Sequence, residues 1–212
     1  MSDKILWDNK HIKYSTEEWI DVPTIFAKQV IKYFPKGAKI LDLGAGQGQD
    51  SRYFVKNGFD VVSTDFSDEA NRLSQEKALH ENLNFKIEKL DLTERFPFDN
   101  EIFDIVYIHL SLQFWNKEKT AEILDEIVRV LKTKGLLASM FNTIDDPEVK
   151  KSRLTPDGCY MTPSGLTKSF YTVDDIANLT TGVFEPIILD SKGETHKDEV
   201  KTLIRFLGIK RF

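Results

Sequence analysis

The chain has little cysteine and no long apolar run. Its 212 residues include one cysteine, Cys159, and no apolar stretch of membrane-spanning length. One cysteine excludes an intrachain disulfide and fits a reducing compartment. The N-terminus also lacks the apolar core of a secretory signal. We therefore expect a cytoplasmic protein without a membrane partner.

An excess of basic charge is also missing. The formal net charge is −5 and the pI is about 5.5. Nucleic-acid binders usually carry a basic stripe, so a nucleic-acid partner is disfavoured. His11, His80 and His196 have no spacing typical of metal ligands, so we expect no metal site and place these three residues on the surface. Hydrophobic residues make up 41% of the chain, enough for a sheet buried on both faces.

Three glycines, in contrast, are concentrated in one short segment directly after an apolar run. The segment 39–48 is an apolar run that ends in Asp42 and continues with Gly44, Gly46 and Gly48 at every second position. The run predicts a buried parallel strand, and the glycines predict a turn that tolerates no Cβ. Such a turn, between a strand and a helix, is where open α/β sheets bind nucleotides. Asp42 adds a negative charge that suits a ligand with a cationic end.

Two families use loops of this kind. The dinucleotide fingerprint needs a third small residue where this chain has Gln49. The segment instead resembles motif I of class I S-adenosylmethionine (SAM) methyltransferases, (D/E)-x-G-x-G-x-G. That resemblance implies that SAM is the cofactor. It also implies that the loop, Ala45 included, passes under its methionine part and that Asp42 faces its ammonium group.

Two further acids extend the resemblance. Asp65 ends a second predicted strand about twenty residues past the loop, the spacing of an acid that binds ribose hydroxyls. In the family, Phe66 beside it belongs to the same site. Asp91 ends a third strand, and the resemblance implies that it accepts a hydrogen bond from the adenine amino group, with Leu92 against the ring. Segments 102–108 and 131–137 resemble the fourth strand and the turn into the fifth.

The alternation of strands and helices predicts one α/β domain over residues 1–212. The resemblance implies a three-layer sandwich with helices on both faces of a seven-stranded, mostly parallel sheet in the order 3-2-1-4-5-7-6, strand 7 being antiparallel. We expect a helical cap over 1–36 and a substrate lid over 142–170, because so long a loop in a compact domain is usually functional or disordered. Helices are predicted at 22–34, at 49–56, from 68 onward, at 117–131 and at 172–179. Pro23 lies in the first turn of the first of these, and Ser67 is the N-cap of the third. The last two strands are predicted at 185–191 and 200–209.

The acceptor side is less defined by its residues. His109 follows the fourth strand and is either a general base or a residue that lines the cofactor. Gln113 is either an acceptor contact or a packing residue. From the lid, Arg153, Tyr160 and Tyr171 are expected to contact the acceptor. Aromatic residues before the first predicted helix either fold over the cofactor or pack that helix onto the sheet, namely Trp7, Tyr14 and Trp19.

We conclude from the sequence that the protein transfers a methyl group from SAM by in-line displacement, which depends mainly on alignment. The layout resembles small methyltransferases of metabolites or of the tellurite-resistance type, so a small-molecule acceptor is expected. A SAM-binding module without turnover and an NAD-dependent oxidoreductase are the alternatives. A protein or tRNA methyltransferase is less favoured, because no Asn/Asp-Pro-Pro-aromatic motif follows the fourth strand. The acceptor atom and the oligomeric state stay open.

Overall fold

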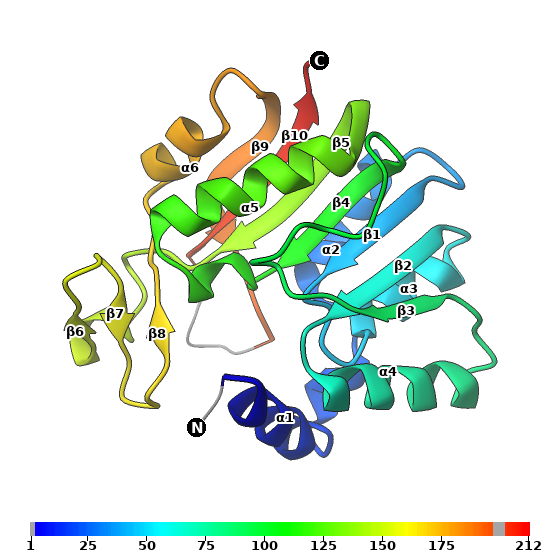
Figure 1. Ribbon diagram of the computed structural model, residues 1–212, viewed down its shortest axis with the longest axis horizontal. Helices are drawn as coiled ribbons and strands as arrows, with labels where there is room; N and C mark the ends of the chain where they lie inside the picture. Colours follow the sequence, from blue (N-terminus) through cyan, green and yellow to red (C-terminus); the bar gives the residue numbers. More distant parts are fainter. Residues whose placement is uncertain (1–2, 197–201) are drawn as a thin grey trace.

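The computed structural model describes residues 3–196 and 202–212, and a seven-stranded sheet lies at its centre (Figure 1). The strand order is β3-β2-β1-β4-β5-β10-β9. It equals the predicted order 3-2-1-4-5-7-6, because β9 and β10 are the sixth and seventh strands of this sheet. Among the described strands of this sheet, the antiparallel pairs are those that β10 forms with β5 on one side and with β9 on the other. The other pairs are parallel. The predicted fold is therefore confirmed. The strands are β1 Lys39–Leu43, β2 Asp60–Asp65, β3 Lys86–Lys89, β4 Phe103–His109, β5 Leu131–Phe141, β9 Phe184–Gly193 and β10 Leu203–Lys210. Positions 200 and 201 of the predicted last strand lie outside the described residues.

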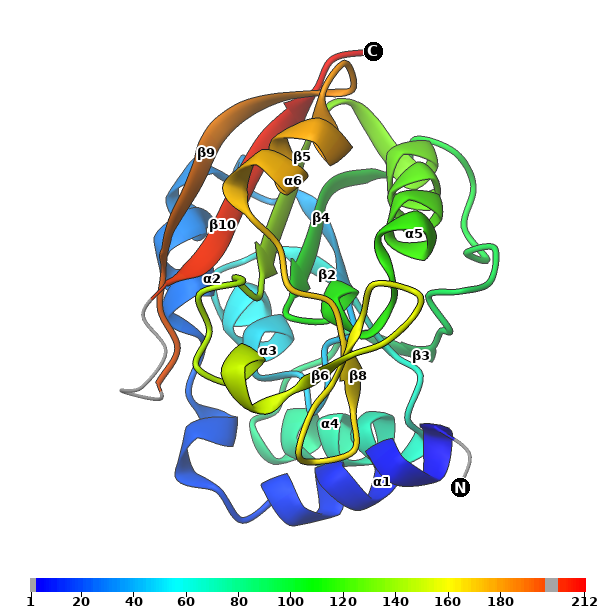
Figure 2. The same ribbon diagram turned by 90° about the vertical axis from the view of Figure 1, so that its left-hand side faces the viewer.

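Helices cover both faces of the sheet, with α2 and α3 on one side and α5 on the other (Figure 2). Among the residues that the structure describes, no helix is long and apolar enough to cross a membrane. The α-helices are α1 Asp3–Tyr14, α2 Ile25–Val30, α3 Gln49–Lys56, α4 Asp68–His80, α5 Lys117–Val130 and α6 Val173–Thr180. Short 3-10 helices are η1 Glu18–Asp21, η2 Ile31–Tyr33, η3 Leu112–Phe114 and η4 Val149–Lys151.

The strands are apolar on both sides because each side faces a separate core. Leu41 and Val106 point toward the core that α5 completes with Ile127. Their chain neighbours Ile40 and Tyr107 point the opposite way, toward the core formed with α2 and α3. This alternation explains why the central strands read as continuous apolar runs in the sequence.

The N-terminal region differs from its prediction. Trp7 and Tyr14 do not precede the first helix but lie within α1. The helix predicted over 22–34 begins only at Ile25, with Thr24 as its N-cap, so Pro23 lies before the cap and not in the first turn. A tertiary contact fixes this start, since the Thr24 backbone N–H donates to Asp50 Oδ1 of α3 at 2.7 Å.

The segment predicted as a lid contains a small sheet of its own. Strands β6 Arg153–Leu154, β7 Tyr160–Met161 and β8 Thr167–Lys168 form an antiparallel meander. This meander is tied to the segment after β4, because the Ser169 backbone N–H donates to the Gln113 carbonyl oxygen at 2.7 Å. The insertion therefore lies beside the carboxyl end of β4 (Figure 1).

Candidate active site

The glycine loop joins the carboxyl end of β1 to α3, and its backbone requires glycine three times. Gly44, Gly46 and Gly48 have φ values of 64°, 57° and 71°. A Cβ on Gly44 would lie 2.3 Å from Ser111 Oγ, and one on Gly48 would lie 2.3 Å from Ser74 Oγ. The prediction that this turn excludes a Cβ is confirmed for both positions, by conformation and by contact.

Asp65 holds the loop from the next strand. Its Oδ2 accepts the Gly46 backbone N–H at 2.8 Å, and its Oδ1 accepts the Ser67 backbone N–H at 2.8 Å. Burial raises the pKa of Asp65, while the nearby His11 and these N–H groups act in the opposite sense. The half-buried Phe66 follows directly. One carboxylate thus fixes both the glycine loop and the start of α4, the place expected for a ribose-binding acid.

Asp42 lies underneath the loop. The residue is 2% exposed, and its Oδ2 accepts the Ser51 hydroxyl of α3 at 2.5 Å. Burial, followed by the charge of Asp50, raises the pKa of Asp42 to about 8. Burial thus favours the protonated carboxyl more than in an exposed aspartate, and the contact of Asp42 with a cofactor ammonium group stays a prediction.

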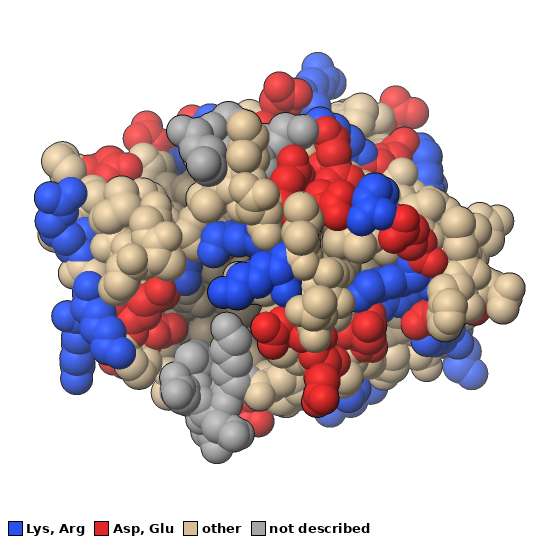
Figure 3. Space-filling model, turned by 90° about the horizontal axis from the view of Figure 1, so that it is seen from below, with Lys and Arg blue, Asp and Glu red and all other residues tan. Residues whose placement is uncertain are grey.

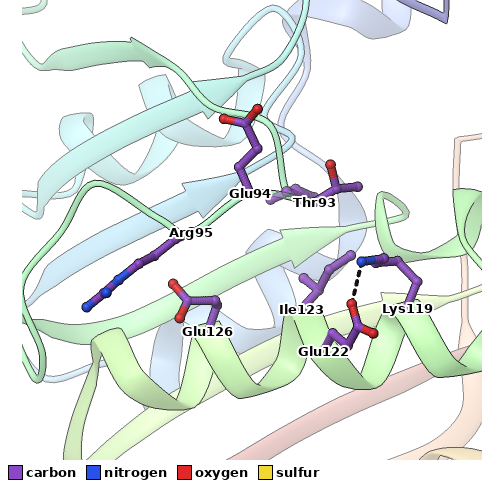
Figure 4. Close-up of a pocket in the computed structure, with 8 residues that line it drawn as sticks. Thr93, Glu94, Arg95, Lys119, Glu122, Ile123 and Glu126 are labelled. Atoms are coloured by element: carbon purple, nitrogen blue, oxygen red, sulfur yellow. Dashed lines mark hydrogen bonds and ion pairs between the residues drawn. The ribbon is translucent and has the colours of Figure 1, made fainter.

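Asp91 and Leu92 follow β3. Asp91 Oδ1 accepts the backbone N–H and the hydroxyl of Thr93, at 2.9 and 2.7 Å. Leu92 is buried in the α5-side core and also lines a hollow of about 290 Å³ between this connection and α5. The rim of that hollow is charged, with Arg95 opposite Glu126 and Lys119 paired to Glu122 (Figure 4). The expected adenine contacts of Asp91 and Leu92 stay predictions.

Two unpartnered polar atoms lie in the last residue of β4 and just after the strand. His109 Nε2 and Gln113 Oε1 are buried and make no hydrogen bond. Burial lowers the pKa of His109, with Asp50 opposing this shift and His196 adding to it. The imidazole is therefore neutral near pH 7 and keeps a lone pair that can accept a proton. Buried polar atoms without a partner are uncommon, so these two mark the end of β4 as a candidate part of the site.

The three residues predicted to contact the acceptor from the lid lie in three different environments. Tyr171 is fully buried, with its hydroxyl 3.0 Å from Thr120 Oγ1 and its ring 5.3 Å from that of Phe141. It belongs to the core, and this corrects its expected role as an acceptor contact. Tyr160 is half-buried against Phe170, and Arg153 is exposed on β6. Arg153 and Tyr160 lie on the paired strands β6 and β7, whereas Tyr171 lies in the core.

His11 is the residue that sequence reasoning missed. It was expected on the surface, but it is only 7% exposed, because α1 lies across the glycine loop. Gln47 Nε2 donates to the His11 carbonyl oxygen at 2.9 Å, and the Trp7 ring packs on Phe114 with centroids 4.7 Å apart. The spacing of Trp7, His11 and Tyr14 places them on one helix face, a pattern that could have revealed α1.

A model of the methyltransferase domain family matches residues 40–135, the stretch that contains this loop and the three acids. The match covers somewhat less than half of the chain and shows what this stretch is similar to. With the sheet order described above, this confirms the resemblance to class I SAM methyltransferases in domain and fold.

Relatives of this methyltransferase domain include a sarcosine/dimethylglycine N-methyltransferase of Aphanothece halophytica, 37% identical over 108 residues, or 50% of this chain and 38% of that protein. Among solved structures, the 1,6-didemethyltoxoflavin-N1-methyltransferase of Burkholderia thailandensis, with bound S-adenosylhomocysteine, has a TM-score of 0.74 at 16% identity and covers 97% of this chain and 84% of that chain. TehB of Haemophilus influenzae has a TM-score of 0.68 at 21% identity over 87% of this chain and 61% of that chain.

The structural likenesses establish the fold alone, because their sequence identities are low. This chain spans about two fifths of the length of the sarcosine/dimethylglycine enzyme. The tellurite-resistance subtype receives only weak support, since the TehB likeness is one of fold.

The loop gives a first testable prediction. We expect Gly44→Ala to lower the free energy of unfolding by about 1–3 kcal/mol more than Gly58→Ala, measured by urea denaturation. Both positions have positive φ, but a Cβ at Gly58 would meet nothing within 4 Å, whereas one at Gly44 would also lie 2.7 Å from Ser111 Cβ. Equal losses in the two variants would show that close contact does not shape the loop.

A second prediction concerns pH. The pKa of Asp42 is about 8 in the folded protein against an ordinary value of 3.8, so its contribution to stability is complete at low pH and is lost as the pH rises through about 8. Asp42→Asn cannot titrate. We expect the decline in unfolding free energy between about pH 4 and pH 8 to flatten in this variant by up to about 1.4 kcal/mol per pH unit. Denaturation across this range, with the exposed Asp60→Asn as control, tests this; parallel profiles for wild type and Asp42→Asn would contradict it.

Proposed function

We propose that the protein transfers a methyl group from SAM to a small-molecule acceptor. The observation that carries this proposal is the glycine loop bound to Asp65 within the matched methyltransferase domain. The relative that acts on sarcosine and dimethylglycine supports a small acceptor with a nitrogen nucleophile.

The residues at the loop fit this cofactor. Asp65 accepts backbone N–H groups on both oxygens, and its carboxylate has further lone pairs that can accept a ribose hydroxyl. The glycines allow a ligand to approach the backbone closely. Both hydrogen bonds from Thr93 to Asp91 end on Oδ1, so Oδ2 can accept a hydrogen bond from an amino group.

The chemistry then depends on alignment more than on a catalytic pair. The sulfonium of the bound cofactor supplies an electrophilic methyl group. The loop and Asp65 fix the cofactor end, and the segment after β4 positions the acceptor through Gln113. His109, held neutral by burial, accepts a proton from an acceptor that enters protonated.

Calorimetric titration with SAM, S-adenosylhomocysteine and NAD in parallel tests the cofactor. We expect both adenosyl ligands to bind and NAD to give no heat. Asp65→Ala should weaken SAM binding by about 1–3 kcal/mol, or roughly 5- to 150-fold, through loss of a charge-assisted hydrogen bond. The variant's unfolding temperature, measured alongside, separates this loss from misfolding.

The alternatives predict other results in the same titration. NAD binding alone would favour an oxidoreductase. SAM binding without product across a panel of small amines, thiols and carboxylates would favour a binding module without turnover. Unchanged SAM affinity in Asp65→Ala would refute the ribose assignment.

His109 can be tested once an acceptor is found. We expect His109→Ala to lower kcat by about 10²- to 10⁴-fold, the usual contribution of a general base, while the Kd for SAM changes little. The acidic limb of the rate profile should disappear with the imidazole. Equal losses in kcat and SAM affinity would instead make His109 a residue that lines the cofactor.

A further inference from the structure

Helix α1 contacts the loops that follow three neighbouring strands. His11 lies against the loop after β1, as described above. Asp8 Oδ1 accepts the hydroxyl of Ser67 after β2 at 2.5 Å. Trp7 packs on Phe114 after β4. A ligand held by these loops therefore lies next to α1, which runs below the carboxyl ends of the strands (Figure 1).

The face seen from below shows the same region from outside. Basic side chains gather around a central hollow there, with acidic side chains on either side (Figure 3). Within α1, Lys10 is half-buried with its Nζ 5.8 Å from the centre of the Trp7 ring. The outer side of α1 is mixed, with Ile5 and Ile12 exposed beside Asn9 and Lys13, whereas the inner side, with His11, is buried against the loops.

On that inner side, His11 reaches the two groups that define the ribose position. Its Cε1 lies 3.2 Å and its Nδ1 3.9 Å from where a Cβ on Gly46 would be. The charge of Asp65 acts on the imidazole from β2, with those of Asp8 from α1 and Glu69 from α4. Nδ1 is buried and has no hydrogen-bond partner. A buried polar atom of this kind calls for a ligand that satisfies it.

We propose that His11 is a ligand-contacting residue of the cofactor site, whose Nδ1 hydrogen-bonds a hydroxyl of the ribose held by Asp65. Through this contact α1 closes over the bound cofactor. A ribose hydroxyl has one proton to donate and can also accept. If Nδ1 carries a hydrogen, one hydroxyl accepts it and donates to the carboxylate. In the other tautomer, one ribose hydroxyl donates to Nδ1 and its neighbour on the ring donates to the carboxylate. The inference rests on the proposed function, because the ribose is that of SAM or S-adenosylhomocysteine.

The test uses S-adenosylhomocysteine and four single variants of the full chain, titrated at pH 7.5. His11→Ala should weaken binding by about 5- to 100-fold. An asparagine side chain places a polar atom near the position of Nδ1, whereas glutamine reproduces Nε2. His11→Asn should therefore stay within a few fold of wild type, and His11→Gln should bind as weakly as His11→Ala. His80→Ala, which changes an exposed histidine of α4, is the matched control and should bind like wild type.

Hydrogen exchange supplies a readout besides affinity. S-adenosylhomocysteine should slow exchange of the α1 amides from residue 8 to 14 in wild type and in His11→Asn, but much less in His11→Gln. The Asn and Gln pair decides the question if His11→Ala fails to fold.

Two results would overturn the inference. One is binding by both His11→Ala and His11→Gln at wild-type strength, and the other is binding by His11→Asn as weak as that of His11→Gln. If Asp65→Ala still weakens binding in those cases, the proposed function stands and only the role of His11 is lost. If wild type binds neither adenosyl ligand, the proposed function fails first.

Discussion

The hydrogen bond from the Gly46 backbone N–H to Asp65 is the contact on which the site depends. It joins the ends of two adjacent parallel strands, because Asp65 ends β2 and Gly46 follows β1. The loop can make it only in a left-handed conformation at all three glycines. The loop glycines are also in close contact with Ser111, Ser74 and His11, and these side chains occupy the space that a Cβ atom would need. Geometry fixed in this way is available to a ligand without further ordering, which favours tight binding.

Buried polar contacts support the loop from below. The Ser51 hydroxyl lies between Asp42 of β1 and Ser63 of β2, while Asp50 accepts the Tyr107 hydroxyl at 2.6 Å. Arg52, 2% exposed, donates to the Gln47 carbonyl oxygen at 2.6 Å. These three consecutive residues of α3 therefore connect the loop to β1, β2 and β4. Such a network carries a cost in desolvation, seen in the raised pKa of Asp42, and in return specifies one arrangement of the loop.

Local sequence signals were sufficient to predict helices whose ends depend on neighbouring residues. The helix predicted over 49–56 matches α3, and the helix predicted over 172–179 matches α6, which begins after the N-cap Thr172. Partner-dependent features were missed. The Thr24 backbone N–H donates to Asp50, and this contact fixes the start of α2. Tyr171 is buried because it packs against Thr120 and Phe141. His11 is buried because α1 packs on the glycine loop. None of these partners is near in sequence, so neither periodicity nor propensity could indicate them.

The short helix η3 is where the two halves of the site meet. Phe114 contacts Trp7 of α1, while the backbone carbonyl of Gln113 accepts from Ser169 after β8, and the Ser169 hydroxyl donates to the Trp115 carbonyl oxygen at 2.6 Å. The cap near the cofactor loop and the insertion near the expected acceptor side therefore rest on the same few residues after β4. A shift of η3 would move both coverings together, because it is packed against each of them. Both coverings are therefore attached to the sheet through the same short helix, η3.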